Sequence, residues 1–579
     1  MLGKEMFDIW YQKIPAHLRK ELDAIKDNEN EIKERFSVPL AFGTAGMRGE
    51  VGLGTFRMND YTVARATKGL AMFIASLGAE AMERGVVISY DTRRCSLEFA
   101  IIVAKVLSYA KIKSFIFDTV HPVPMCSFAV RHLNAIAGVM ITASHNPKEY
   151  NGYKVYGQDG AQMSPEDTQI VVKYIDSLTD YFAVELDGVQ FPDSIKRLDN
   201  VKLNDYITVI GKTVDEAYYA EIAKLSLSPK EVSEYGKTIK LVYTPIHGTG
   251  YVPVTTMLSR MGISVDCVAE QIEPDTEFST VPAPNPENPS ALKMGIELGD
   301  KIGADVVIGT DPDCDRMGLA IRDNKGQFRL LNGNQIGALL LDYILTRLKE
   351  ENNLPKNGAV VKTIVTTTLA DRIAKNFGIT VIDVLTGFKF IGEKIKEWEK
   401  TNEYSFIFGY EESYGYLRGT HARDKDAVVA AMLTAEMVCY YESKGVGLYQ
   451  RLMEIFERYG YYCEEVISID YKGVGAMAEM ASAMAKVRSK TITKLAEYEV
   501  EFTADYLAKK VTYPDGRIEA TTLPQTNAIK YFLKDGQFVC VRPSGTEPKL
   551  KVYVLCYDSD MEKSKQKAKV LLEAIKNEL

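Results

Sequence analysis

Several features that would point to particular classes of protein are scarce in this chain of 579 residues. Its 8 cysteines are scattered and form no CxxC pair, which argues for a reducing compartment and against a disulfide framework. Basic residues are not in excess, because the formal net charge is −8, and this disfavours nonspecific nucleic-acid binding. No uncharged apolar run reaches the roughly 18 residues of a membrane span, and the first residues lack the apolar core of a signal peptide. We therefore expect a cytoplasmic protein with no nucleic-acid or membrane partner, although a local basic cleft for a phosphorylated metabolite remains possible.

What the chain does contain is a repeated alternation of strand and helix patterns. After a charged helical segment at 1–38, β-branched runs alternate with helical segments, which predicts βαβ units with mostly parallel sheets. Strands are expected at 86–91, 113–118, 135–143, 238–246, 305–311, 359–367 and 405–409, and helices at 96–109, 252–262, 291–302, 333–350, 368–377 and 388–400. The part after residue 460 is strand-rich and ends in a helix expected at 559–579. The pattern predicts three similar α/β domains and a separate C-terminal α+β domain.

A polar loop with the sequence TASHNP follows the buried strand expected at 135–143. Ligands of open α/β sheets bind outside the carboxyl ends of strands, and a serine in a tight loop there, Ser144, is a candidate nucleophile. Neighbouring side chains of an extended chain point in opposite directions, so His145 is not expected to act as the base for Ser144. The surroundings lack GxSxG, which weakens the case for a hydrolase. A plain turn is the alternative interpretation.

A second polar loop, DPDCDR, follows the strand expected at 305–311. Asp311, Asp313 and Asp315 stand at alternate positions and can converge on one hard cation such as Mg²⁺. An EF-hand loop would need glycine and glutamate where Arg316 and Arg322 stand, so that interpretation fails. The alternative is a solvated acidic turn.

Two further loops combine residues suited to sugars and phosphates. GYEESYG at 409–415 presents carboxylates and a hydroxyl on a glycine-flanked loop, which suits the recognition of sugar hydroxyls. RPSGTEPK at 542–549 combines small residues, hydroxyls and an arginine, a composition typical of an anion-binding nest. A surface turn is the alternative interpretation in both cases.

These four motifs, in this order, resemble the α-D-phosphohexomutase family and especially its phosphoglucomutase branch. TASHNP is similar to the family's phosphoserine loop, DPDCDR to its metal loop, GYEESYG to its sugar-binding loop and RPSGTEPK to its phosphate-binding loop. The resemblance implies four domains around a central cleft, of which three are related α/β domains with mixed sheets and the fourth is α+β. We expect these domains at 1–205, 206–323, 324–458 and 459–579.

Four more segments resemble the family once it is considered. FGTAGMRG at 42–49 is similar to its N-terminal signature, DTR at 91–93 to its YDxR segment, TGFK at 386–389 to a sugar-orienting loop, and HARDKD at 421–426 to a run of its glucose enzymes. Some members carry a histidine where Tyr416 stands here. Lys154 and Lys425 are therefore the expected candidates for proton transfer.

The resemblance implies a set of site residues. Ser144 would be phosphorylated in the active enzyme, and Mg²⁺ and glucose 1,6-bisphosphate would be the cofactor and the activating intermediate. The expected catalytic residues are Ser144, Arg48, His145, Lys154 and Lys425. The expected metal ligands are Ser144, Asp311, Asp313 and Asp315. The expected substrate-binding residues are Arg316, Thr386, Gly387, Lys389, Glu411, Ser413, Arg542, Ser544, Gly545 and Thr546.

The activity implied by the resemblance is interconversion of glucose 1-phosphate and glucose 6-phosphate, with sugar phosphates as the only predicted partners. Phosphopentomutase, phosphomannomutase and glucose 1,6-bisphosphate synthase activities are alternatives that use the same chemistry. A metal-dependent phosphatase is a further alternative, but simple hydrolysis does not need a second phosphate site. An inactive member that serves as a scaffold is disfavoured because all the expected chemical residues are present. The sequence does not predict the oligomeric state.

Overall fold

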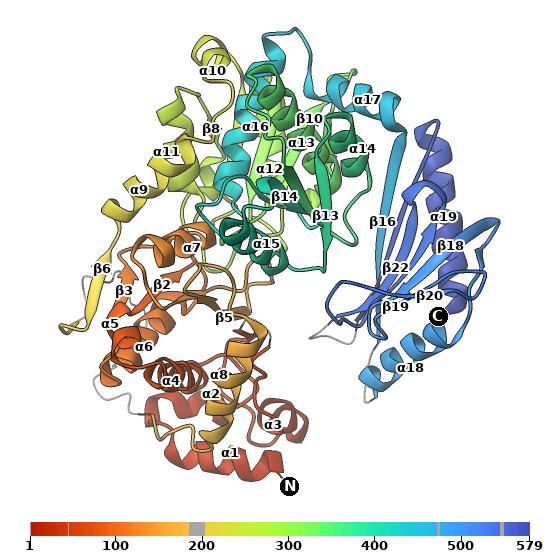
Figure 1. Ribbon diagram of the computed structural model, residues 1–579. Coiled ribbons are helices and arrows are strands. Elements are labelled where there is room, and N and C mark those ends of the chain that lie inside the picture. The colour runs from red at the N-terminus through yellow and green to blue at the C-terminus, as the bar shows by residue number, and fades with distance from the viewer. Residues whose placement is uncertain (1, 44–45, 185–197, 199–202, 472–474, 545–548) are drawn as a thin grey trace.

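A computed structural model describes residues 2–43, 46–184, 198, 203–471, 475–544 and 549–579 of the chain. The chain forms four units in sequence order, coloured from red and orange through yellow and green to blue in Figure 1. Three units are built on mixed sheets with helices, and the fourth is an antiparallel sheet with two helices. This is the α/β class expected from the sequence. Among the described residues, no helix is long and apolar enough to cross a membrane.

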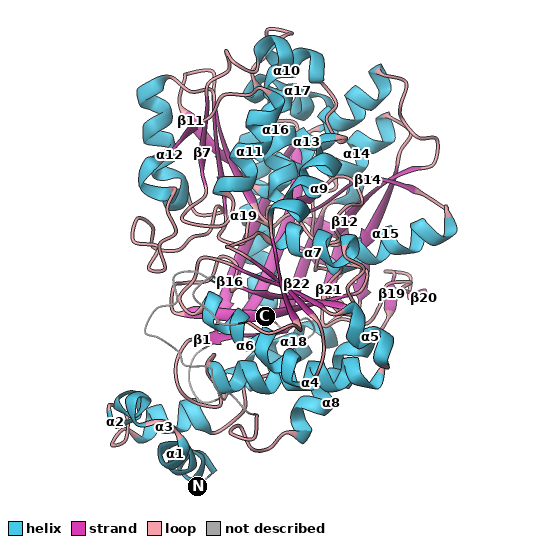
Figure 2. Ribbon diagram, turned by 90° about the vertical axis from the view of Figure 1, so that its left-hand side faces the viewer, coloured by secondary structure: helices cyan, strands magenta, loops and turns pink. Residues whose placement is uncertain are grey.

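The N-terminal helices form a small core of their own against the first unit, and Figure 2 shows them at its lower end. Trp10 is fully buried and its ring contacts those of Phe36 and Tyr61. The first helix ends at Lys13, just before Pro15, because proline disfavours continuation of a helix. These elements are α1 (Leu2–Lys13), η1 (Ala16–Leu18), α2 (Arg19–Asp23) and α3 (Glu29–Phe36).

The first unit has the strand order β1-β5-β4-β2-β3-β6, in which β1 and β5 run antiparallel to their neighbours. Its elements are β1 (Gly46–Glu50), α4 (Asp60–Ser76), α5 (Ala79–Arg84), β2 (Val86–Tyr90), α6 (Ser96–Tyr109), β3 (Ser114–Phe117), α7 (Val123–His132), β4 (Ala137–Ile141), β5 (Tyr150–Gly157), α8 (Pro165–Ser177) and β6 (Ile207–Ile210). Because β6 pairs with β3, the first sheet extends past the boundary that we expected after residue 205.

The second unit has the order β11-β10-β9-β7-β8, with β7 parallel to β8 and β9. Strands β10 and β11 are antiparallel. Its elements are α9 (Lys212–Ala223), α10 (Pro229–Tyr235), β7 (Leu241–Thr244), α11 (Tyr251–Met261), β8 (Asp266–Cys267), η3 (Ala269–Gln271), α12 (Pro289–Ile302), β9 (Val306–Thr310), β10 (Met317–Arg322) and β11 (Phe328–Leu331).

The third unit has the order β13-β12-β14-β15, and only β15 is antiparallel to its neighbour. Its elements are α13 (Gly333–Glu350), β12 (Gly358–Thr363), α14 (Leu369–Asn376), β13 (Thr380–Val384), α15 (Lys389–Thr401), β14 (Ser405–Glu411), β15 (Gly415–Leu417), α16 (Ala427–Glu442) and α17 (Leu448–Tyr459). Helix α16 packs against α10 and α11, so the second and third units share one continuous apolar core.

The fourth unit is antiparallel, with the order β16-β23-β22-β21-β18-β19-β20 and with β17 paired to β18. Its elements are β16 (Tyr461–Asp470), α18 (Ala476–Ser489), β17 (Lys494–Leu495), β18 (Tyr498–Asp505), β19 (Lys510–Thr512), β20 (Ile518–Ala520), β21 (Ile529–Leu533), η4 (Lys534–Gly536), β22 (Phe538–Pro543), β23 (Lys549–Asp558) and α19 (Met561–Glu578). The expected strands and helices are all observed to within a few residues. The expectation of mostly parallel sheets holds only for the central strands of the first three units.

Candidate active site

Ser144 lies in the loop after β4 and is 3 % exposed. Its backbone N–H donates to the Thr142 hydroxyl over 2.8 Å, and its own hydroxyl donates to a carboxylate oxygen of Asp311 over 2.9 Å. The hydroxyl also lies 3.2 Å from Nδ1 of His145. The expectation that His145 points away from Ser144 is wrong, because Ser144 has a left-handed backbone with φ of 53°. The serine hydroxyl therefore lies between a carboxylate and an imidazole.

The imidazole of His145 is held in its uncharged form. Burial lowers the pKa of His145 well below its ordinary value, and the nearby cations Arg316 and Arg48 lower it further. The ring is therefore neutral near pH 7 and carries a free lone pair on one nitrogen.

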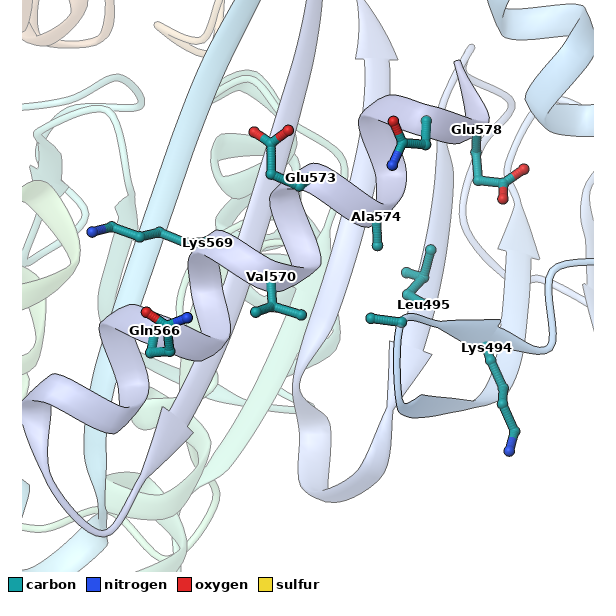
Figure 3. Close-up of a pocket in the computed structure, with 10 residues that line it drawn as sticks. Lys494, Leu495, Gln566, Lys569, Val570, Glu573, Ala574 and Glu578 are labelled. Atoms are coloured by element: carbon teal, nitrogen blue, oxygen red, sulfur yellow. The ribbon is translucent and has the colours of Figure 1, made fainter.

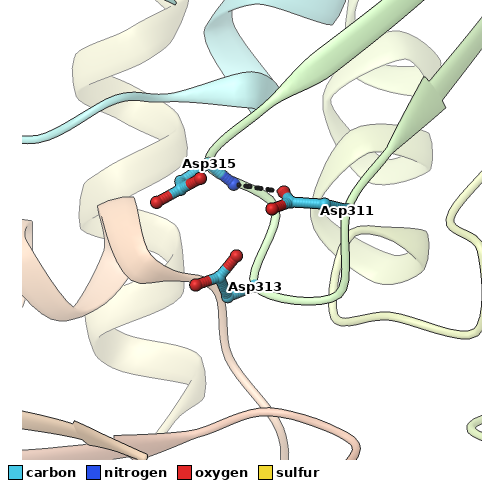
Figure 4. Close-up of side chains that lie close together, drawn as sticks. All are labelled: Asp311, Asp313 and Asp315. Atoms are coloured by element: carbon cyan, nitrogen blue, oxygen red, sulfur yellow. Dashed lines mark hydrogen bonds between the residues drawn. The ribbon is translucent and has the colours of Figure 1, made fainter. Parts of the chain in front are cut away.

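Asp311, Asp313 and Asp315 follow β9 and lie close together (Figure 4). One carboxylate oxygen from each lies within 4.8 Å of the other two, and the residues are at most 1 % exposed. Asp311 accepts from the backbone N–H groups of Asp315 and Arg316 over 3.1 and 3.0 Å. Oδ1 of Asp313 and Oδ1 of Asp315 are buried without a hydrogen-bond partner among the described residues. Buried carboxylates with unpartnered oxygens are the ligands that a hard divalent cation takes in proteins.

Two lysines balance part of this negative charge. Lys154 lies 2.8 Å from Asp313, and Lys425 lies 3.1 Å from Asp315 and 2.9 Å from Asp424. Burial raises the pKa of Asp311, and repulsion from the other two aspartates raises it further. Burial alone would also raise the pKa of Asp313, but the Lys154 ammonium group outweighs it and the pKa is lowered. The structure thus brings both expected lysines to the metal loop.

Two arginines shape the serine loop. Arg48, on β1, donates to the side-chain oxygen of Asn146 over 2.7 Å, directly beside the loop of Ser144. Arg93 donates to four backbone carbonyls of this loop and of the residues that follow it, at 2.6–3.1 Å. The sequence placed Arg93 in a family-like segment but gave it no role. Its contacts show that it holds the backbone of the loop in shape.

A cavity of about 680 Å³ lies beside these loops and is lined by residues of all four units. The expected site residues that line it are His145, Arg316, Thr386, Gly387, Glu411, Ser413 and Arg542. The sequence interpretation missed other lining residues, which include Asn285, Glu287, Asn334, Glu464 and Lys551. The proline- and asparagine-rich run at 282–289 was the available signal for Glu287, which accepts from Arg316 over 2.6 Å.

The third unit supplies the wall that carries the expected sugar loop. Glu411, at the end of β14, accepts from the backbone N–H of Gly387 over 2.9 Å. Burial raises the pKa of Glu411 to about 7. Lys389 is half-buried at the start of α15, and burial lowers its pKa while the nearby Glu393 opposes that shift. Among the described residues that line the cavity, Lys389 is not found.

The expected phosphate loop begins at the end of β22. Arg542 lies on that strand and reaches the cavity, and the backbone N–H of Ser544 donates to the carbonyl of Lys549 over 2.7 Å. Gly545 and Thr546 lie outside the described residues. Through Arg542 the fourth unit therefore contributes to the lining of the same cavity as His145 of the first unit.

A second, open hollow of about 570 Å³ lies between α19 and β17 on the fourth unit (Figure 3). Leu495, Val570 and Ala574 line its apolar part, and Lys494 and Glu573 lie at its edge. None of the expected site residues lines this hollow.

Comparison with known proteins agrees with this fold and site. The chain matches the phosphoglucomutase/phosphomannomutase family over alpha/beta/alpha domain I at residues 39–182, domain II at 216–326, domain III at 332–459 and the C-terminal domain at 481–572. The four matched domains fall, in the same order, within the four structural units described above. The chain belongs to the phosphoglucomutase/phosphomannomutase family.

Two bacterial relatives cover almost the whole chain. It is 38 % identical over 547 residues to a phosphoglucomutase of Staphylococcus epidermidis, which covers 94 % of this chain and 95 % of that one. It is 35 % identical over 550 residues to a phosphoglucomutase of Staphylococcus aureus, with the same coverage of 94 % and 95 %.

Two crystal structures share the fold. One is the open form of parafusin, a phosphoglucomutase of Paramecium, with a TM-score of 0.64, 16 % identity and coverage of 93 % of this chain and 95 % of that one. The other is a phosphoglucomutase/phosphomannomutase family protein of Burkholderia thailandensis, with a TM-score of 0.63, 16 % identity and coverage of 92 % and 97 %. At this identity the likeness concerns the fold alone.

Proposed function

We propose that this chain is a phosphoglucomutase, which interconverts glucose 1-phosphate and glucose 6-phosphate through a phosphorylated Ser144. One observation carries the proposal: the Ser144 hydroxyl donates to Asp311, and the neighbouring His145 lines a cavity that Arg542 of the fourth unit also lines. A phosphoryl transfer between two ends of one sugar needs a nucleophile and a separate phosphate site, and both are present. The relatives named above, at 35–38 % identity over 94 % of the chain, are phosphoglucomutases.

The three aspartates fit a magnesium ion. They are buried, their oxygens converge within 4.8 Å, and two of these oxygens lack another partner among the described residues. Asp311, Asp313, Asp315 and an oxygen on Ser144 would hold the ion. When bound, Mg²⁺ supplies positive charge that offsets the negative charge of the transferring phosphoryl group.

The residues around Ser144 can perform the transfer. The free sugar hydroxyl attacks phosphorus of phosphoserine, a new O–P bond forms, and the bond between phosphorus and the Ser144 oxygen breaks. Neutral His145 is the candidate acceptor of the hydroxyl proton, whereas Lys154 and Lys425 have raised pKa values, are protonated, and are the candidates to donate a proton to the leaving Ser144 oxygen. The product is glucose 1,6-bisphosphate, which turns in the cavity and returns its other phosphoryl group to Ser144. Phosphate is conserved in this cycle, so the net reaction is an isomerisation.

The remaining site residues would bind and orient the substrate. Arg48 and Arg316 add positive charge near the transferring group, because transfer depends mainly on positioning and electrostatics. The far phosphate would be held by Arg542, Ser544, Gly545 and Thr546. The sugar would be oriented by Glu411, Ser413, Thr386, Gly387 and Lys389.

A coupled assay tests the proposal. Glucose 1-phosphate is supplied with Mg²⁺ and trace glucose 1,6-bisphosphate, and formation of glucose 6-phosphate is followed beside a parallel reaction with ribose 1-phosphate. Rapid turnover of the glucose ester that stops with EDTA is the expected result. Preference for the pentose would transfer the same chemistry to another substrate. Release of inorganic phosphate in place of an isomer would overturn the proposal in favour of a phosphatase.

A further inference from the structure

A loop of the second unit, residues 245–250, lies directly behind the aspartate loop. It follows β7, which runs parallel to β9, so both loops leave the same edge of the sheet. Thr249 donates twice to the carbonyl oxygen of Pro312, from its backbone N–H over 2.8 Å and from its hydroxyl over 2.9 Å. Thr249 is 3 % exposed, so this double contact is shielded from water.

Two glycines let the loops approach this closely. A Cβ on Gly248 would stand 2.5 Å from Cα of Pro312. A Cβ on Gly250 would stand 2.6 Å from the Thr310 hydroxyl and 2.9 Å from the sulfur of Cys314. These distances are shorter than van der Waals contact, so a larger residue at position 248 would displace the backbone of Pro312, and one at position 250 would displace the side chains that surround it.

The loop itself is held rigidly from the other side. Ile246 and His247 both have left-handed backbones, with φ of 48° and 59°, which are rare for such residues. A partly buried chain of hydrogen bonds at 2.6–2.9 Å holds this backbone, and it runs from Thr244 to Gln271, Thr280 and His247 and ends at the carbonyl of Glu273. Every link is satisfied when His247 carries its proton on Nδ1.

We propose that Thr249 is a positioning residue that sets the spacing of the metal-binding aspartates. Pro312 stands between Asp311 and Asp313, and proline has no backbone N–H, so its carbonyl is the backbone group through which this residue can be held. Holding that carbonyl fixes the peptide plane between Pro312 and Asp313, and the ring-restrained φ of Pro312 relates this plane to the preceding peptide, which carries Asp311. This inference rests on the proposed function, because it assumes that the aspartates bind Mg²⁺.

The test uses the full-length protein and Mg²⁺ itself as the probe. Thr249→Val removes the hydroxyl donor and keeps the shape of the side chain. The dissociation constant for Mg²⁺, measured by isothermal titration calorimetry at one phosphorylation state, should rise about tenfold or more, as is typical when a group that supports metal ligands is lost. Thr249→Ser keeps the donor and should bind Mg²⁺ as the wild type does.

Two further variants separate the possible failures. Thr255→Val removes a hydroxyl bond within α11, away from the aspartates, and should leave Mg²⁺ binding unchanged. Asp313→Asn should abolish it, and a wild type that binds no Mg²⁺ would overturn the proposed metal site. Wild-type affinity in Thr249→Val, with Asp313→Asn impaired, would overturn the positioning role alone. In the mutase assay, saturating Mg²⁺ should restore the rate of Thr249→Val, while its KM for glucose 1-phosphate stays unchanged throughout.

Discussion

The first three units are joined to one another differently from the way the fourth is joined to them. Buried side chains link the first three pairwise: Thr142 donates to Asp313 over 3.2 Å, Tyr156 donates to Asp424 over 3.1 Å, and Tyr218 donates to Asp426 over 2.8 Å. Each of these bonds ends on a carboxylate within or next to a site motif. The chemical centre is therefore built where three units interlock.

The fourth unit is bonded mainly to the third. Figure 1 shows β16 leading from α17 into the blue sheet. Lys530 donates to the carbonyl of Ile364 over 2.6 Å, and Asn332 donates to Glu464 over 3.2 Å. The third and fourth units also share an apolar cluster, to which the fourth contributes Phe538, Tyr553 and Leu555. The two joints therefore differ in kind: bonds to carboxylates of the site motifs link the first three units, whereas the bonds between the third and fourth units lie outside those motifs.

Two buried lysines illustrate the difference between the joints. Lys425, in the interlocked part, lies among Asp315 and Asp424; burial alone would lower its pKa, but these carboxylates raise it strongly. Lys530, at the joint of the fourth unit, lies 3.8 Å from the centre of the Phe538 ring, and burial lowers its pKa to about 8. The first charge is compensated, and the second is only partly so.

The largest effect should come from a substitution at Ser144, in the part of the molecule where the first three units interlock. Ser144→Ala removes the nucleophile and should lower kcat on the order of 10⁴-fold or more, because no other group can carry the phosphoryl group. The substitution deletes one oxygen, so the melting temperature should stay near that of the wild type. Ser177→Ala, on the exposed end of α8, is the matched control and should remain fully active. Near wild-type turnover of Ser144→Ala would contradict the covalent route.

The next largest effect should come from a substitution at Arg542, in the fourth unit. Arg542→Ala should raise KM for glucose 1-phosphate roughly 10- to 100-fold, since a hydrogen bond between charged groups contributes about 1.5–3 kcal/mol. Arg517→Ala, on the exposed hairpin of the same unit, controls for loss of positive charge and should leave KM unchanged. A loss confined to kcat would show that Arg542 acts in the chemistry and not as a phosphate site.

A smaller effect should come from loosening the interlocked joint without touching the site. Tyr218→Phe removes the hydroxyl that donates to Asp426. Just before Asp426 in the chain, Lys425 pairs with Asp424 and with Asp315 of the aspartate loop. We expect a loss of about 1–3 kcal/mol in the free energy of unfolding and a reduced kcat with KM unchanged. Tyr219→Phe, on the same helix, is the control, since the Tyr219 ring packs against Arg260. The free energy of unfolding is measured by denaturant titration, and kcat and KM by steady-state kinetics. Equal values for the two variants would contradict the proposed role of the Tyr218 hydroxyl.

The smallest effect concerns the pH dependence of the fourth unit's joint. The folded protein releases the proton of Lys530 near pH 8, whereas the unfolded chain releases it near the ordinary value of 10.5. Between these values the unfolded state binds more protons, so the contribution of Lys530 to stability rises as the pH rises from about 8 to 10.5. Lys530→Met should remove this part of the pH dependence. Melting curves of both proteins at pH 7, 8, 9 and 10 would test it, and parallel curves would contradict the lowered pKa.

Much of the site could be predicted from sequence because its chemistry is concentrated in short motifs at strand ends. Ser144 and the three aspartates were selected as nucleophile and cation ligands from residue type, spacing and place after a buried strand. The structure places the Ser144 hydroxyl 2.9 Å from Asp311 and one oxygen of each aspartate within 4.8 Å of the other two. The direction of His145 was predicted wrongly because the left-handed backbone of Ser144 is not visible in the sequence. The expected boundary after residue 205 separates β6 from the first unit, whereas the structure pairs β6 with β3 of that unit. This pairing joins segments far apart in the chain, so the sequence pattern did not reveal it.

By itself, the sequence determined the order of strands and helices, the class of fold and the residues that carry the chemistry, because periodicity, capping and side-chain type are local properties. Only the tertiary structure decided which of these residues line the same cavity. It also decided that Lys154 pairs with Asp313 and Lys425 with Asp315, and that Thr249 donates to the carbonyl of Pro312. These are contacts between segments far apart in the chain. Their geometry depends on how the sheets pack, which no local pattern encodes.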